Sequence, residues 1–567
     1  MYTTATAFID ALVEQGIEYM FVNLGSDHPG LVEAIAKARA EGRPVPRVIT
    51  CPNEMVALTI AHGFTQVTGR PQAVVIHVEC GTQALAGAVH NAAKARIPVL
   101  IFAGSSPFTQ DGELLGSRNE FIQWIQDVHD QRGLVRGYMR YDNEIRTGAN
   151  VKQVVHRAMQ FARTDPKGPV YLMAAREVLE ASCEQVDIDI ARWGPVSAPA
   201  LGDRNARSIA GDIAKARRPL VVTSYLGRNP AAARQLASLC DRYGIGVVES
   251  VPSYVNVPHG HDCFLGSYWN DPRQNEALAE ADLVLVIDSD VPWIPAKNRP
   301  SAHARILHID IDPLKEQMPL WYIEPHGAYR ADAETALAEI SEALSNLAID
   351  QGLIGERRAH YARLSAKRRA RLASEEAETG ALTTARLMAS VRTHLGNHAI
   401  VINEGITNYQ PVFDHIAPNE PGTMFASGGG SLGYNGGAAI GAKLASPDAT
   451  VVAISGDGTY MFTVPSSVHW IARRYDAPFL QIVLNNDGWN APRHSALAVH
   501  PDGYASRAET LDLSFSPAPD YGGIAKAAGN AEPIMVDRES DLDEVMARAF
   551  AILRNERRSV LVEARLG

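Results

Sequence analysis

The sequence predicts three consecutive α/β domains, each built on a parallel β-sheet. Apolar runs of strand length alternate with segments of helical periodicity along the whole chain. In addition, 567 residues are too many for one hydrophobic core, because a domain usually holds roughly 100 to 200 residues. Alternation of this kind is typical of parallel sheets whose two faces are covered by helices.

The first domain is predicted to span residues 1–185. Its buried strands are expected at Tyr19 to Asn23, Arg47 to Thr50, Ala73 to Val78, Pro98 to Ala103 and Val170 to Met173. A connection rich in Pro and Gly follows around Trp193 to Gly202, and such composition favours a domain boundary there.

The second domain is predicted to span residues 195–347 and repeats the same alternation. Its strands are expected at Pro219 to Ser224, Gly246 to Glu249, Leu283 to Asp288 and Arg305 to Ile311, with a last helix at Asp332 to Leu347. The pattern again indicates a parallel sheet with helices.

A charged helix is predicted next, from Arg357 to Glu378. It carries a basic cluster made of Lys367, Arg368, Arg369 and Arg371. A solvated linker helix is the favoured interpretation, because runs of charge usually face water. A phosphate-binding patch is the alternative.

The third domain is predicted to span residues 375–567. Its strands are expected at Ala399 to Asn403, Thr423 to Ala426, Thr450 to Ser455, Leu480 to Leu484 and Ser559 to Glu563.

Composition narrows the class of function. The net charge of −11 and the lack of a basic face argue against a nucleic-acid binder. No apolar run approaches the roughly 18 residues of a membrane span, and the start lacks the order of a signal peptide, so a cytoplasmic protein is expected. Five scattered cysteines without a CxxC pair suggest neither a disulfide framework nor a zinc site. Small-molecule chemistry is therefore favoured.

Two turns in the third domain bear oxygen ligands. One predicted strand ends in Gly456-Asp457-Gly458, and a later one ends in Asn485-Asn486-Asp487-Gly488. Parallel sheets place ligands at such carboxyl ends, and carboxylate, amide and carbonyl oxygens suit Mg²⁺. Each turn alone is also an ordinary strand-ending turn. A dinucleotide site is a further alternative, because Gly428, Gly430 and Gly433 satisfy GxGxxG.

In the first domain, Glu54 follows a predicted strand and opens an apolar helix. It is expected to be mostly buried, and a buried carboxylate needs a partner. The alternative is a first-turn carboxylate that interacts with the helix dipole after an Asn53 cap.

Taken together, the two turns resemble the magnesium–diphosphate motif of thiamine-diphosphate-dependent enzymes. The run from Asn53 through Cys80-Gly81-Thr82-Gln83, Asn91 and Pro98 resembles the pyrimidine-binding domain of the same family. The resemblance covers essentially the whole chain, in the order pyrimidine, central and diphosphate domain shared by acetolactate synthases, benzoylformate decarboxylases and 2-hydroxyacyl-CoA lyases.

The resemblance implies a role for each matching residue. Asp457, Asn486 and the Gly488 carbonyl would bind Mg²⁺, with Asn485 as the alternative to Asn486. Glu54 would protonate the pyrimidine ring of thiamine diphosphate. Other cofactor contacts would come from the Gly430 carbonyl, the Leu432 side chain, Gly456, Gly458, Thr459 and Gln83.

Three residues match the benzoylformate decarboxylase pattern, in which a serine and two histidines bind the acid and move protons. They are Ser26, His77 and His261. Each has an alternative: Ser26 as a turn residue, His77 as a hydrogen-bonded core histidine, and His261 as a residue that acetolactate synthases share. His28, Gln83, Trp489 and Asn490 are further candidates for the substrate pocket.

The expected function is a lyase or carboligase that acts on 2-oxo acids with thiamine diphosphate and magnesium. A 2-hydroxyacyl-CoA lyase, which would use acyl-CoA and aldehyde substrates, is the alternative, and a cofactor-binding subunit without turnover is the alternative from another class. Relatives hold each cofactor between two subunits, which implies a homodimer as the minimal active unit and favours a homotetramer. Whether the central domain binds flavin cannot be read from the sequence.

Overall fold

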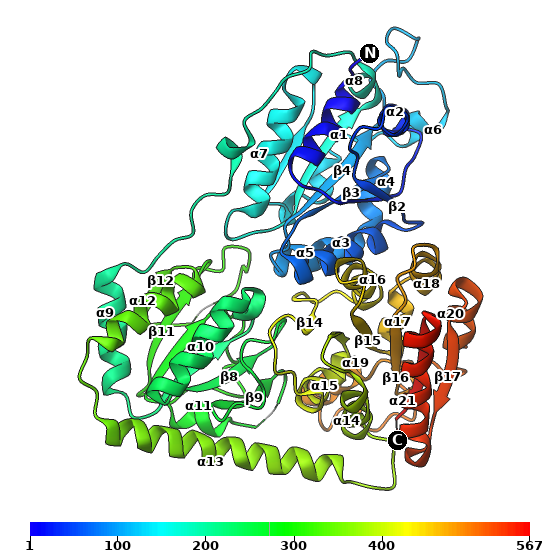
Figure 1. Ribbon diagram of the computed structural model, residues 1–567. Coiled ribbons are helices and arrows are strands. Elements are labelled where there is room, and N and C mark those ends of the chain that lie inside the picture. Colours follow the sequence, from blue (N-terminus) through cyan, green and yellow to red (C-terminus); the bar gives the residue numbers. More distant parts are fainter. Residues whose placement is uncertain (272, 322, 567) are drawn as a thin grey trace.

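Figure 1 shows the computed structural model of the protein, which describes residues 1–271, 273–321 and 323–566. Three six-stranded parallel sheets follow one another along the chain, each flanked by helices. The predicted fold class is confirmed. The domain limits proposed above stay predictions.

The first sheet has the strand order β2-β1-β3-β4-β6-β5. Its strands are β1 (Tyr19–Val22), β2 (Arg47–Thr50), β3 (Gln72–Ile76), β4 (Val99–Ser105), β5 (Tyr141–Glu144) and β6 (Val170–Ala175). Its helices are α1 (Thr4–Glu14), α2 (Pro29–Ala40), α3 (Glu54–Thr68), α4 (Val78–Ala84), α5 (Ala86–Lys94), α6 (Ile122–Ile125), α7 (Val151–Arg163) and α8 (Arg176–Glu180).

The second sheet has the strand order β12-β11-β10-β7-β8-β9. Its strands are β7 (Pro219–Thr223), β8 (Gly246–Ser250), β9 (Phe264–Tyr268), β10 (Leu283–Ile287), β11 (Arg305–Asp310) and β12 (Gly327–Arg330). Its helices are α9 (Asp203–Lys215), α10 (Pro230–Tyr243), α11 (Glu276–Glu280) and α12 (Ala333–Ser345).

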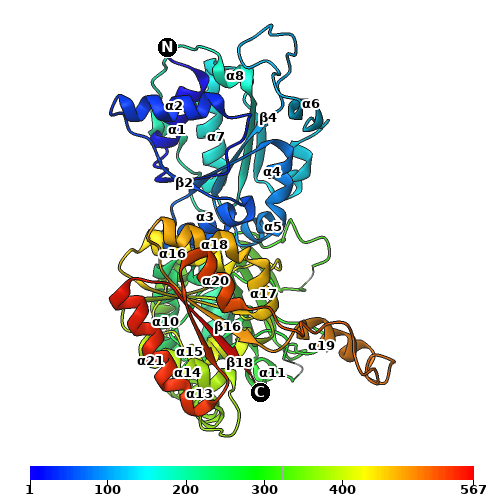
Figure 2. The same cartoon turned by 90° about the vertical axis from the view of Figure 1, so that its right-hand side faces the viewer.

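The third sheet has the strand order β14-β13-β15-β16-β18-β17. Its strands are β13 (Ala399–Glu404), β14 (Met424–Ala426), β15 (Thr450–Gly456), β16 (Leu480–Asn485), β17 (Glu532–Val536) and β18 (Val560–Arg565). Its helices are α14 (Thr384–His394), α15 (Tyr409–Ile416), α16 (Asn435–Ala445), α17 (Asp457–Phe462), α18 (Pro465–Arg474), α19 (Asn490–Val499), α20 (Tyr521–Gly529) and α21 (Leu542–Ala551). Helix α19 and the chain after it project from the body of the molecule (Figure 2).

Four strands were not predicted, namely β5, β9, β12 and β17. All four lie at a sheet edge, where a strand has one neighbour instead of two. Their side chains are on the whole less buried than those of the central strands; in β5 and β12, for example, none is fully buried. These four strands lack the continuous apolar run by which the central strands were recognised.

The linker helix α13 (Gln351–Glu376) runs along the second domain toward the third (Figure 1). It is less solvated than expected. Arg357 is fully buried and donates to the backbone carbonyls of Tyr243 (3.1 Å) and Ile213 (2.9 Å), at the ends of α10 and α9. Such bonds satisfy carbonyls that a helix end leaves unpaired. Arg357 thus attaches α13 to the second domain.

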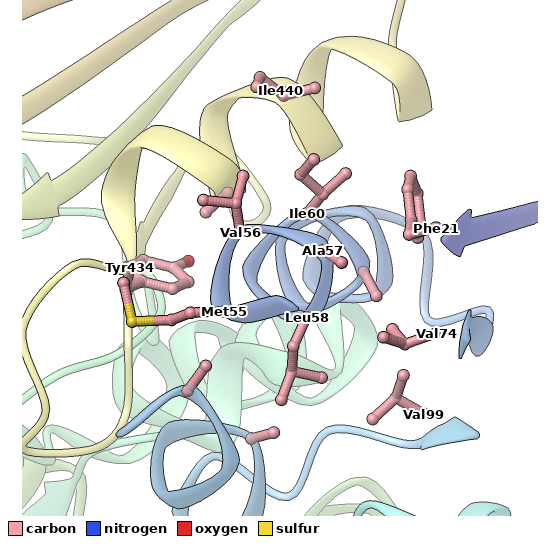
Figure 3. Close-up of a cluster of buried hydrophobic side chains, with 14 of the residues drawn as sticks. Phe21, Met55, Val56, Ala57, Leu58, Ile60, Val74, Val99, Tyr434 and Ile440 are labelled. Carbon is pink, nitrogen blue, oxygen red and sulfur yellow. The ribbon is translucent and has the colours of Figure 1, made fainter. Parts of the chain in front are cut away.

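Helices α3 and α16 join the first domain to the third. Met55, Val56 and Ile60 of α3 lie in one buried cluster with Tyr434 and Ile440 (Figure 3). The two helices approach closely: a Cβ atom added to Gly437 would lie only 2.0 Å from Thr59 Oγ1. The start of α3, where Glu54 stands, is thereby held near the start of α16, since the Met55 side chain reaches Gly433.

Candidate active site

Asp457 connects the two ligand-bearing turns of the third domain. It directly follows β15, at the start of α17, and its side chain is 2% exposed. Oδ1 accepts the N–H of Gly458 (2.7 Å) and Oδ2 accepts the N–H of Gly488 (2.9 Å). Burial raises the pKa of Asp457 above its ordinary value. A cation at this carboxylate would offset that cost of burial.

The two adjacent asparagines, Asn485 and Asn486, differ in their hydrogen bonds. Asn485 donates to Glu563 Oε1 (2.8 Å) and accepts the N–H of Asp487 (3.0 Å), so its side chain is engaged. The side-chain oxygen of Asn486 is buried and has no hydrogen-bond partner among the described residues. A buried acceptor without a partner is costly. This orphaned oxygen next to a buried carboxylate fits a hard cation such as Mg²⁺.

An aromatic group covers the same turn. A Cβ atom added to Gly458 would lie only 2.4 Å from the Trp489 ring. Position 458 must therefore be glycine for the ring to pack there. The ring also meets Phe462 (centroids 6.0 Å apart) and Phe515 (5.0 Å). Trp489 and Asn490 therefore stand beside the turn of Asp457, and the side chain of Thr459, two residues after Asp457, is buried.

The GxGxxG segment contacts the first domain. The N–H of Gly430 donates to His90 Nε2 (3.1 Å), and Ser431 exchanges two hydrogen bonds with the Asn91 side chain (3.0 and 2.8 Å). Leu432, the predicted cofactor support, is half-buried in this segment.

A buried carboxylate counts against the dinucleotide alternative. Glu404, fully buried at the end of β13, accepts the N–H groups of Tyr434 (3.1 Å) and Asn435 (2.8 Å). Burial raises the pKa of Glu404 to about 8. A dinucleotide diphosphate would need these amides at the helix start, and Glu404 already occupies them.

Glu54 is the first residue of α3. Asn53 caps this helix by accepting the N–H of Val56 (3.2 Å), as the alternative interpretation expected. The carboxylate is half-exposed rather than mostly buried, because the α3 start lies at the surface of the first domain. Its Oε1 lies 3.2 Å from the position of a Cβ on Gly81, in helix α4, which follows His77.

His77 belongs to a partly buried chain of hydrogen bonds. Its Nδ1 lies 2.6 Å from Asp27 Oδ1, and its Nε2 lies 3.1 Å from Gln126 Oε1. The loop before Asp27 packs on the ring, since a Cβ on Gly25 would overlap it at 2.0 Å. Ser26 is therefore held in the loop beside His77. The Asp27 hydrogen bond raises the pKa of His77 above its ordinary value, and the Glu54 charge adds to this effect.

Two predicted site residues, His28 and His261, each contact a carboxylate. His28 is fully buried with Nδ1 2.8 Å from Asp27 Oδ1, so it lies behind Asp27 rather than in an open pocket. His261 binds Asp241 (3.0 Å) at the end of α10. The predicted role of His261 in catalysis stays a prediction. Gln83 donates to Glu79 Oε2 (2.5 Å).

Asp27 and Gln126 were not predicted from the sequence. Asp27 stands in the run Ser26-Asp27-His28 after the first strand, and a carboxylate beside a histidine was an available signal. Gln126 reaches His77 from a loop 49 residues away, and no local pattern indicates that contact.

We expect Asp27→Asn to lower the pKa of His77. The amide can still accept the N–H of Val78, as Asp27 Oδ2 does at 3.0 Å, but it has no charge to stabilise an imidazolium. Because the parent pKa is raised, His77 should stay protonated to higher pH in the parent than in the variant. An NMR titration of the His77 Cε1 resonance, assigned by its loss in His77→Gln, measures this shift.

Glu54→Gln should lower the pKa of His77 less than Asp27→Asn does. The reason is that the Glu54 charge raises this pKa less than the Asp27 hydrogen bond does. An unchanged pKa of His77 in Asp27→Asn would show that the observed pair does not control its protonation.

Comparison with known proteins places this arrangement in a family. Residues 2–134 match the N-terminal TPP binding domain of thiamine pyrophosphate enzymes, residues 206–340 match their central domain, and residues 405–564 match their C-terminal TPP binding domain. The chain belongs to the thiamine pyrophosphate enzyme family. The predicted family is confirmed, and the protein is an enzyme.

Relatives within this family differ in activity. Sulfoacetaldehyde acetyltransferase of Castellaniella defragrans is 23% identical over 99% of this chain and 92% of its own length. Benzoylformate decarboxylase of Pseudomonas aeruginosa is 25% identical over 97% of both chains. The structure of 4-hydroxybenzoylformate decarboxylase from Rhodococcus jostii RHA1 has a TM-score of 0.77 at 21% identity, covering 99% of both chains. That likeness shows the shared fold.

The described residues contain no helix with the length and apolar character needed to cross a membrane.

Proposed function

We propose that the enzyme holds thiamine diphosphate through Mg²⁺ and cleaves or forms the carbon–carbon bond next to the carbonyl of a 2-oxo acid. The observation that carries the proposal is the buried Asp457 carboxylate beside the unpartnered Asn486 oxygen. Both atoms follow carboxyl ends of neighbouring strands β15 and β16. With the Gly488 carbonyl they offer three hard oxygen ligands, and diphosphate oxygens can complete the octahedron of Mg²⁺. Gly456, Gly458 and Thr459 would contact the diphosphate.

Glu54 is the proposed proton donor to the pyrimidine ring of the cofactor, and Gly430 and Leu432 are proposed to position that ring. When bound, the cofactor supplies a nucleophilic carbon and takes up the electrons of the broken bond. The protein has to hold the ring, deliver one proton to it and keep the metal in place.

The hydrogen-bonded residues Asp27, His77 and Gln126 of the first domain suit a 2-oxo acid substrate. With its pKa raised by Asp27, His77 is protonated over a wider range near neutral pH, and its Nε2–H can bind a substrate carboxylate that displaces the Gln126 oxygen. Ser26 in the neighbouring loop adds a hydroxyl donor, and Trp489 and Asn490 stand at the metal turn. We assign the substrate pocket to these four residues.

The 2-hydroxyacyl-CoA lyase alternative loses support, because the basic cluster of α13 is already paired. Lys367 binds Glu276 (2.7 Å), Arg368 binds Asp414 (3.1 Å) and Arg369 binds Asp262 (3.0 Å). A CoA phosphate would have to displace these carboxylates.

The test is to incubate the protein, loaded with thiamine diphosphate and Mg²⁺, with a panel of 2-oxo acids and 2-hydroxyacyl-CoAs. We expect release of CO₂ and aldehyde, or of a carboligation product, from at least one aromatic or branched 2-oxo acid. Aldehyde release from the CoA thioesters alone would replace the proposal with its alternative.

We also propose that the smallest active species is a homodimer and that a homotetramer forms from it. Large apolar side chains are exposed on the loop of the first domain next to Gln126, including Leu115, Phe121 and Ile125. Met461 and Phe462 of α17 are exposed as well. Exposed apolar groups of this kind favour a protein interface. We expect light scattering coupled to activity to show a dimer or larger species, and a fully active monomer would contradict this.

Subunit mixing tells whether the cofactor lies within one chain or between two. The structure joins α3 and α16 within one chain, whereas the resemblance places this junction between chains. Glu54→Gln and Asp457→Ala chains can rebuild an intact site on mixing only if each site is shared by two chains. Activity regained on mixing shows a shared site, and its absence shows a site within one chain.

A further inference from the structure

Helix α5 connects all three domains, on the side of the first domain that faces the other two (Figure 1). Its residues His90 and Asn91 form hydrogen bonds with the segment Gly430-Ser431 of the third domain. Just after the helix ends, the Arg96 side chain reaches the second domain, where its two terminal nitrogens donate to the Asp290 carboxylate (2.9 and 2.7 Å). The same helix therefore joins the second domain to the segment that is proposed to position the cofactor ring.

Arg96 meets the second domain where sheets of this kind usually bind a ligand. From β7 the chain continues to β8 on one side, whereas β10 pairs with β7 on its other side, so the strand order reverses between β7 and β10. Ligands of such sheets lie at the carboxyl ends of the strands beside this reversal. Tyr225 follows β7, Asp290 follows β10, and Asp310 ends the next strand, β11. Side chains of the chain itself thus stand where a ligand would be expected.

A network of charges joins these strand ends. Lys315 is buried and donates to Asp290 (2.9 Å) and Asp310 (2.7 Å). The Tyr225 hydroxyl donates to Asp310 (2.7 Å), and the centroid of its ring lies 4.4 Å from the Arg96 guanidinium carbon. Burial alone would raise the pKa of Asp290, but the charges of Arg96 and Lys315 lower it to about 2. Arg96 is thus held by a paired charge and by the face of an aromatic ring.

The backbone of Arg96 has a conformation that favours glycine. Its φ of +56° lies in the left-handed region, in which helices commonly end on glycine. The turn closes α5, because the N–H of Ile97 donates to the Ala92 carbonyl (2.9 Å). A side chain makes this turn less favourable, whereas glycine adopts it without strain. The contacts of the guanidinium are therefore what an arginine adds at this position.

We propose that Arg96 is a positioning residue for the reaction. It fixes the end of α5 to the second domain, and α5 in turn holds the segment Gly430-Leu432 where the cofactor ring requires it. This inference rests on the proposed function, which assigns that segment to the cofactor. It also gives the second sheet a role, because the ion pair of Arg96 with Asp290 takes the place of a ligand at the reversal of strand order.

The test compares Arg96→Gly with the parent, both loaded with thiamine diphosphate and Mg²⁺, by exchange of the acidic ring proton of the bound cofactor with deuterated water. Glycine suits the left-handed turn, so this variant removes the guanidinium without straining the end of α5. We expect exchange about tenfold slower or more, because a displacement of about 1 Å can cost up to about 100-fold in rate even when it arises far from the reacting atoms. Guanidinium chloride at millimolar concentration should restore part of the rate in the variant and leave the parent unchanged.

Arg228→Gln is the matched control. Arg228 pairs with Asp288 (2.5 Å) and lies over the same Tyr225 ring (5.1 Å), yet both charges belong to the second domain, so we expect exchange as fast as in the parent. Exchange in Arg96→Gly as fast as in the parent overturns the proposal. An equal loss in Arg228→Gln, or slowing that guanidinium does not relieve, overturns it too, because the effect would then reflect general loss of packing. A parent that binds no thiamine diphosphate contradicts the proposed function itself, and the proposal falls with it.

Discussion

Glu54→Gln is expected to leave the enzyme folded and able to bind thiamine diphosphate while its activity falls about 100-fold or more. An amide fills the same space and can still hydrogen-bond a ring nitrogen, but it cannot deliver a proton. The change in stability should stay below about 1 kcal/mol, because a half-exposed carboxylate at a helix start contributes no more than that through the helix dipole. The effect on rate should therefore far exceed the effect on folding.

The direct measurement is exchange of the acidic ring proton of bound cofactor with deuterated water, followed by acid quench. Slow exchange in the variant beside fast exchange in the parent supports proton delivery by Glu54. Glu334→Gln is the matched control, because Glu334 is also a half-buried first-turn carboxylate, in α12 of the second domain. If both variants exchange as fast as the parent, Glu54 is only a helix-start carboxylate.

Asp457→Ala is expected to abolish retention of the cofactor. Removing this carboxylate leaves the diphosphate charge without its metal and frees the N–H groups of Gly458 and Gly488. Changes in the outer shell of a metal site already cost up to about 100-fold in affinity, so loss of a direct ligand should cost at least that much. Equilibrium dialysis of thiamine diphosphate in excess Mg²⁺ measures the loss.

Two further variants separate the effect of the Asp457 charge from an effect on folding. Asp457→Asn retains an acceptor for Gly488 and nearly the same shape, so a loss of binding there reflects charge rather than a collapsed turn. Asp487→Asn is the control, because the exposed Asp487 carboxylate accepts from Ser514 Oγ (2.8 Å), outside the proposed ligand set. Tight cofactor binding by a folded Asp457→Asn would show that the negative charge of Asp457 is not needed to hold the metal.

The central strands were predictable because burial on both faces of a parallel sheet requires apolar residues at successive positions. The central strands β15 and β16 end within a residue of the predicted positions. Turn chemistry then located Asp457 and Asn486 at neighbouring strand ends. The edge strands β5 and β17 were missed, because one-sided pairing does not impose that apolar pattern.

The sequence by itself determined the fold class, the family and the chain positions at which ligand atoms follow strands. Burial patterns and turns depend on residues that are neighbours in the sequence. Only the tertiary structure decided what each side chain meets. It engaged Asn485 with Glu563 and left the Asn486 oxygen without a partner among the described residues. It also set Asp27 beside His77 and paired His261 with Asp241. These contacts join residues that are distant in sequence, so no local periodicity encodes them.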